Sequence, residues 1–95
     1  MPEAGGTVID VKRAIASAIK HVGELYSDAH VQNLMLEEVE YDDEHNLWNV
    51  TVGFDRETAP PLPLGEVRLP RFERVYKVVS IDAQTGEARR LKMYR

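Results

Sequence analysis

The fold is decided by one stretch, residues 11–26, which reads VKRAIASAIKHVGELY. Its apolar residues recur every three or four positions, as they do along the buried side of an α-helix. They are Val11, Ala14, Ile15, Ala18, Ile19, Val22, Leu25 and Tyr26. Thr7 is expected to cap this helix, with Asp10 as the acidic member of a capping box. The pattern predicts one amphipathic helix of about five turns over residues 7–27, with small residues that favour close packing on a sheet.

The period of the apolar residues changes to two after this helix, which is typical of β-strands. Residues 31–41 predict a first strand, and the slip in their alternation around Glu37 and Glu38 predicts a bulge. Residues 48–54 alternate most regularly, and a polar turn over residues 42–46 precedes them. Strands joined by so short a turn pair antiparallel, so we expect a first hairpin over residues 31–54.

Residues 55–71 interrupt this pattern with several prolines, which lack an amide donor and keep their neighbours extended and unpaired. We therefore expect a long proline-rich loop over these residues. Apolar residues return over residues 72–81 and 88–94, and the turn between them opens with Asp82 and contains Gly86. This pattern predicts a second antiparallel hairpin over residues 72–94.

Together these elements predict one α+β domain over residues 1–95. Its fold is one N-terminal amphipathic helix packed on a four-stranded antiparallel sheet, in the order α-β-β-β-β. A chain of 95 residues has apolar side chains for only one core, so we expect little room for a deep pocket.

The composition removes several classes of function. The chain has 12 lysines and arginines against 16 aspartates and glutamates, a net charge of −4, which argues against a general nucleic-acid binder. It has no cysteine, and therefore no disulfide, thiolate metal site or cysteine nucleophile. No stretch approaches the roughly 20 apolar residues of a membrane span, and residues 1–7 show no leader, so we expect a cytoplasmic protein without membrane contact.

No motif in the sequence places the side chains that catalysis or metal binding needs. The 3 histidines, His21, His30 and His45, do not have the spacing of a zinc site, and no serine lies in a nucleophile elbow. The acidic turn at residues 42–46 lacks the spacing of a calcium loop. We interpret it as a solvated turn, with weak binding of a divalent cation as the alternative. We therefore expect a protein that is not an enzyme and has no cofactor, catalytic residue or metal site.

Three other features suggest contacts with a partner protein. Residues 60–63 can adopt a polyproline II conformation, although prolines also keep a loop from pairing with sheet edges. Aromatic residues on the strands can anchor a partner or belong to the core. The basic C-terminal residues can meet an acidic partner, or pair with the acidic first hairpin of this chain or of a second copy. The candidate partner-binding residues are Trp48, Pro60, Pro61, Leu62, Pro63, Tyr76, Arg89 and Arg90.

The chain resembles the PepSY domain in three stretches. They are an alanine-rich helix over residues 14–22, the strand sequence Glu38-Val39-Glu40, and a final hairpin over residues 81–87 with the pattern Asp-x-x-Thr-Gly-Glu. The resemblance implies a PepSY/cystatin-like arrangement of helix and sheet. It also implies a role in which the domain inhibits or chaperones a neighbouring protein, without catalytic residues of its own.

We therefore interpret the chain as a non-enzymatic protein-interaction or regulatory module with an unknown protein partner. We expect this partner to bind the sheet face that the helix leaves open, or the proline-rich loop. Apolar side chains from Leu47, Trp48, Tyr76 and Val78 are expected on that face, where they could also form a homodimer. The alternatives are a peptidase inhibitor of the PepSY type and a binder of a small ligand between helix and sheet.

Overall fold

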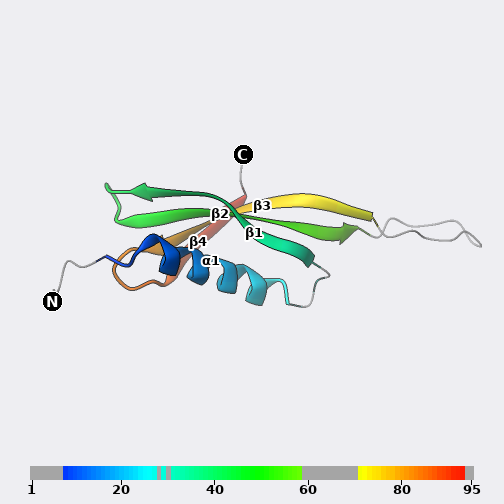
Figure 1. Cartoon of the computed structure of the whole chain (residues 1–95), viewed down its shortest axis with the longest axis horizontal. Helices are drawn as coiled ribbons and strands as arrows, with labels where there is room; N and C mark the ends of the chain where they lie inside the picture. Colours follow the sequence, from blue (N-terminus) through cyan, green and yellow to red (C-terminus); the bar gives the residue numbers. More distant parts are fainter. Residues whose placement is uncertain (1–7, 28, 30, 59–70, 94–95) are drawn as a thin grey trace, which may run out of the picture.

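The computed structural model describes residues 8–27, 29, 31–58 and 71–93. Its elements are the helix α1 (Val11–Leu25) and the strands β1 (Val31–Asp42), β2 (Leu47–Thr58), β3 (Arg71–Asp82) and β4 (Ala88–Met93). The strands form one antiparallel sheet in the order β1-β2-β3-β4. Figure 1 shows α1 lying along one face of this sheet. The expected α+β fold, a helix packed on a four-stranded antiparallel sheet, is confirmed.

The helix begins later than the sequence pattern indicates. Asp10 is its N-cap, and the Asp10 side chain accepts a hydrogen bond from the backbone amide of Arg13 at 2.9 Å. Asp10 therefore supplies the cap itself, and the expected capping box is wrong. Thr7, its other expected member, lies outside the described residues. The helix ends at Leu25, so it has 15 residues and is shorter than the expected span.

The core lies between α1 and the sheet. Its fully buried side chains come from α1, β2 and β3, and they are Ala14, Ala18, Val22, Val50, Val52, Phe54, Val79 and Ile81. Burying one side chain of the size of valine or phenylalanine contributes about 1.5–3 kcal/mol. The small residues of α1 bring the helix close to the sheet, as their spacing predicts. Near the end of the helix the rings of Tyr26 and Phe54 pack with 4.9 Å between their centroids.

The expected loop over residues 55–71 is wrong at both ends. β2 continues to Thr58, which pairs with Arg71 at the start of β3. The prolines permit this pairing because they lie between the two paired segments. The extended part of the hairpin lacks alternating apolar residues, and there the Arg56–Glu73 ion pair at 3.4 Å links the two strands. Figure 1 shows β2 and β3 continuing past the end of α1. Pro60, Pro61, Leu62 and Pro63 lie outside the described residues.

The bulge expected in β1 is confirmed, and the strand contains a second irregularity. The register of β1 against β2 shifts between Leu36 and Glu38, as expected, and again between Gln32 and Met35. Asn33, inside the second shift, has a φ of 57°, a left-handed conformation that asparagine adopts more readily than most residues. Bulges of this kind hinder the pairing of an edge strand with another strand.

The turn of the second hairpin is held by Asp82. Its Oδ1 atom accepts hydrogen bonds from the backbone amides of Gln84 at 2.8 Å and Thr85 at 3.1 Å. Gly86 has a φ of 80°, which explains the glycine at this position. The hairpin spans residues 71–93 as described, and Tyr94, the expected last residue of its second strand, lies outside the described part. Among the described residues, no helix is both long enough and apolar enough to cross a membrane.

Candidate functional site

The face of the sheet opposite α1 is the candidate functional surface, and we call it the open face. No described element covers it (Figure 1). The strand register arranges its side chains in rows that cross all four strands. One row consists of Glu38, Thr51, Val78 and Lys92, and the next consists of Glu40, Asn49, Ser80 and Arg90. Each of these rows begins with an acidic residue on β1 and ends with a basic residue on β4.

Tyr76 on β3 is an exposed aromatic residue of the open face, with 40% of its surface accessible. On one side it borders a hollow of about 230 Å³, which is lined by Glu37, Glu38, Thr51 and Tyr76. A second hollow of about 280 Å³ lies at the edge of β3 beyond the end of β4. Its lining residues are Arg56, Glu73, Arg74, Val75, Tyr76, Lys77 and Met93. Tyr76 therefore contributes to the lining of both hollows.

Arg74 is held next to Tyr76 by two carboxylates. Its guanidinium lies 2.6 Å from Glu37 Oε2 and 3.1 Å from Asp55 Oδ1, and it donates to the carbonyl oxygen of Asn33 at 3.1 Å. Asn33 in turn donates its side-chain amide to Asp55 at 2.7 Å. The hydrogen bond with Glu37 raises the pKa of Arg74, while hydrogen bonds from Asn33 and then Arg74 lower the pKa of Asp55. These contacts favour the charged forms of both side chains, and the cluster is a clamp that joins β1, β2 and β3.

Gly53 on β2 lies beneath this clamp. A Cβ atom at Gly53 would come within 2.7 Å of Glu37 Oε2 and 2.9 Å of Arg74 Nη2. The missing side chain therefore lets the Glu37–Arg74 ion pair lie close against the sheet.

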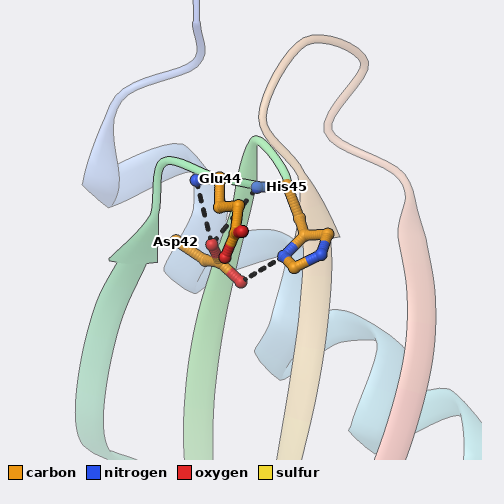
Figure 2. A group of neighbouring side chains, drawn as sticks. All are labelled: Asp42, Glu44 and His45. Atoms are coloured by element: carbon orange, nitrogen blue, oxygen red, sulfur yellow. Dashed lines mark hydrogen bonds and ion pairs between the residues drawn. The ribbon is translucent and has the colours of Figure 1, made fainter.

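The β1–β2 turn gathers Asp42, Glu44 and His45, which Figure 2 shows converging above the end of the sheet. Asp42 Oδ1 accepts hydrogen bonds from the backbone amides of Glu44 at 3.1 Å and His45 at 3.2 Å. Asp42 Oδ2 lies 2.9 Å from His45 Nδ1, and this hydrogen bond is the main cause that lowers the pKa of Asp42. The side chains are close enough to share a cation, with ligand atoms within 4.8 Å of one another. The Asp42 carboxylate nevertheless has a structural role without a cation, because the hydrogen bonds that it accepts close the turn.

Trp48 does not lie on the open face, so that part of the sequence-based expectation is wrong. It packs against the core on the helix-covered side, where its Nε1 atom donates to the carbonyl oxygen of Ile9 at 3.1 Å. Its ring also packs on Tyr41, with 4.9 Å between the ring centroids. The indole therefore ties the chain segment before α1 to the sheet.

The other described candidate residues lie on the second hairpin. Tyr76 and Arg90 lie on the open face, together with Leu47 and Val78. Arg89 pairs with Asp82 of the neighbouring strand at 3.0 Å and not with the acidic first hairpin of its own chain. The structure thus brings Tyr76 and Arg90 onto one surface and leaves Trp48 on the other face of the sheet.

The sequence-based interpretation missed Glu38, Glu40 and Lys92 as members of this surface. The signal was present, because Glu38 and Glu40 flank the apolar Val39, and Lys92 follows Leu91. Strict alternation puts such neighbours on the opposite face from the core. The Arg74 clamp has no comparable signal, since it depends on the register of three strands.

Comparisons of the chain with models of known protein families, with curated protein sequences and with solved structures give no match.

Proposed function

We propose that the chain is a non-enzymatic protein-interaction module and that the open face is its binding surface. The observation that carries this proposal is Tyr76, which is exposed on a sheet face without a covering helix and lines a hollow there with Glu37, Glu38 and Thr51. Met35 and Phe72 on the same face are also exposed, by 49% and 43%. Exposed aromatic and apolar side chains beside hollows are typical of surfaces that bind proteins.

The non-enzymatic part of the proposal rests on the state of the clustered charges. Arg74 and Asp55 are held in their charged forms by hydrogen bonds, and Asp42 closes a turn. A general acid or base needs a pKa near the working pH. The hydrogen bonds lower the pKa of Asp55 and Asp42 and raise that of Arg74, so each pKa moves further from neutral pH. These contacts therefore support binding over catalysis.

Membership of the PepSY family is part of the same proposal. Its support is the order of one helix followed by four antiparallel strands, together with the final turn, where Asp82 caps and Gly86 adopts a positive φ. In this form the partner is a neighbouring protein that the domain restrains, a peptidase included. A small ligand between α1 and the sheet has less support, because Ala14, Ala18 and Phe54 fill that interface and have no exposed surface.

Affinity capture with matched variants tests the proposal. The tagged full chain, its Tyr76→Ala variant and a Leu25→Ala control are used to capture proteins from the lysate of the cells that produce the chain. Leu25 is 57% exposed but lies on α1, away from the open face. We expect a captured protein, identified by mass spectrometry, that is lost with Tyr76→Ala and kept with Leu25→Ala. Capture that survives Tyr76→Ala, or that fails equally in both folded variants, would contradict the proposal.

A further inference from the structure

The open face carries opposite charges along its two outer strands. Glu38 and Glu40 on β1, and Arg90 and Lys92 on β4, belong to the two rows described above. All four are exposed, and within the described part of the chain none of them has an ion-pair partner. The strands β2 and β3 contribute only uncharged residues to these rows. Along these two rows the open face is therefore acidic on β1, basic on β4 and uncharged between them.

This pattern distinguishes between the two symmetric ways of stacking the face on a second copy. A two-fold axis parallel to the strands places β1 over β4 of the second copy and keeps each residue at its own level along the strands. Glu38 then faces Lys92 of the second copy, and Glu40 faces Arg90 of the second copy. Because the arrangement is symmetric, each contact occurs twice. An axis perpendicular to the strands places β1 over β1 and brings like charges together, which is unfavourable.

We propose that the partner of the open face is a second copy of this chain, bound face to face about a two-fold axis parallel to the strands. The inference rests on the proposed function, because it names the partner of the same surface. It also explains why the acidic and basic residues stand at the same levels of the sheet. Stacked sheets lie about 10 Å apart, a gap that glutamate and lysine or arginine side chains bridge from opposite sides.

The centre of the face fits the same arrangement. The axis places β2 over β3 of the second copy, so that Thr51 lies above Val78 and Gly53 lies above Tyr76. Gly53 is covered by the Glu37–Arg74 ion pair, whose atoms occupy the place of a side chain. The ring of Tyr76 from the second copy therefore meets a guanidinium, on which aromatic rings stack favourably.

The size of the face sets the expected strength of the dimer. The rows from Gly53 to Asn49 and their flanking residues cover about 20 Å in each direction, given the strand spacing and the rise per residue of a sheet. This surface is smaller than that of permanent dimers, so we expect weak association that depends on concentration.

Sedimentation equilibrium of the full chain with charge-reversed variants tests the inference. One variant carries Glu38→Lys and Glu40→Lys, which makes both sides of the face basic, and the other carries Arg90→Glu and Lys92→Glu, which makes both sides acidic. We expect the wild type to dimerise, and each variant alone to dimerise at least about tenfold more weakly because like charges meet. An equimolar mixture of the two variants should associate again as a one-to-one complex. A control with Glu24→Lys and Glu87→Lys, which has the same net charge as the first variant but leaves the open face unchanged, should dimerise like the wild type.

Three results would overturn the inference: a wild-type chain that stays monomeric up to millimolar concentration, variants whose mixture does not associate, or growth of the wild type beyond the dimer. The last result would indicate pairing of β1 with β4 edge to edge, which has no closed symmetry. If the wild type is monomeric in sedimentation, but a protein that it captures from the lysate is lost upon Tyr76→Ala, the dimer is overturned and the proposed function stands. If the chain dimerises as expected, but a different protein is captured equally well by the wild type and by Tyr76→Ala, the proposed function is overturned and the dimer stands.

Discussion

The Glu37 carboxylate and the Arg74 guanidinium meet 2.6 Å apart across two strand boundaries, directly above Gly53. Because β2 lies between their strands, the pair fastens the irregular edge strand β1 to the middle of the sheet. Asp55 and Asn33 extend the same contact to the second shift in β1. One arginine, lying close above a glycine, thus links the irregular part of β1 to both central strands.

Substitution of the glycine beneath this pair should displace the pair. In Gly53→Ala, the new Cβ would collide with the ends of two flexible side chains, so they move away and their hydrogen bonds are lost. Alanine is itself better than glycine inside a strand by about 0.5–1 kcal/mol, so the net destabilisation in urea unfolding should stay below about 1 kcal/mol. In a Glu37→Ala background the same substitution should be neutral or stabilising. Effects that simply add in this double-mutant cycle would contradict the contact.

Removal of the arginine should cost more than removal of an exposed one. Arg74→Met breaks contacts with Glu37, Asp55 and the Asn33 carbonyl, and we expect a loss of about 1–2 kcal/mol in the free energy of unfolding. Arg56→Met is the matched control, because Arg56 makes one longer ion pair at 3.4 Å on the exposed part of the same hairpin. That pair should contribute less than about 0.5 kcal/mol. Equal losses in chemical denaturation would contradict the clamp.

Trp48→Phe should lower stability without changing the open face. The substitution keeps an aromatic ring beside Tyr41 but removes the indole donor, which leaves the partly buried carbonyl of Ile9 without its partner. We expect a loss of about 1 kcal/mol in thermal or urea unfolding. Self-association, measured by sedimentation, should be unchanged in the folded variant. Weaker association at unchanged stability would instead assign Trp48 to the binding surface.

Acid should destabilise the protein through three aspartates. The pKa of Asp82 is lowered by the backbone amides of Gln84 and Thr85, that of Asp42 by His45, and that of Asp55 by Asn33 and Arg74. A carboxylate whose folded-state pKa is depressed stabilises the fold fully above its unfolded pKa, and this contribution is lost as pH falls through the folded pKa.

The thermal midpoint should therefore be steady near neutral pH and should drop once the pH falls below about 4. Replacing Asp82, Asp42 and Asp55 together by asparagine should flatten this drop. Asp43→Asn is the control, because Asp43 is exposed and has no hydrogen bond or ion pair among the described residues. A drop of unchanged size in the triple variant would contradict the assignment.

These residues also show how far the sequence predicts the structure. Period and residue size place Ala14, Ala18 and Val22 on the buried side of α1, and alternation places Val50 and Val52 in the core. The same alternation puts Trp48 in phase with Val50, so its position on the helix-covered face could have been predicted. These features depend only on neighbours in sequence, and local patterns determine them.

The features that the sequence does not reveal depend on partners far along the chain. Residues 55–58 have no apolar alternation, and they form a strand because residues 71–74 pair with them across the hairpin. The asparagine at position 33 permits a positive φ but does not by itself predict one, and the contact of its carbonyl oxygen with Arg74 joins residues far apart in the sequence. The rows that join Glu38 to Lys92 follow from three successive registers, so the charge pattern of the open face becomes visible only in the folded sheet.

The most direct test of the account is a dilution series of the isotope-labelled full chain, followed by the backbone amide chemical shifts. If two copies associate through the open face, the shifts that change with concentration should belong to the row of Glu38, Thr51, Val78 and Lys92, and to Tyr76. The amides of α1, including those of Ala14 and Leu25, should stay constant. Changes concentrated on α1, or shifts that do not depend on concentration anywhere, would contradict the account.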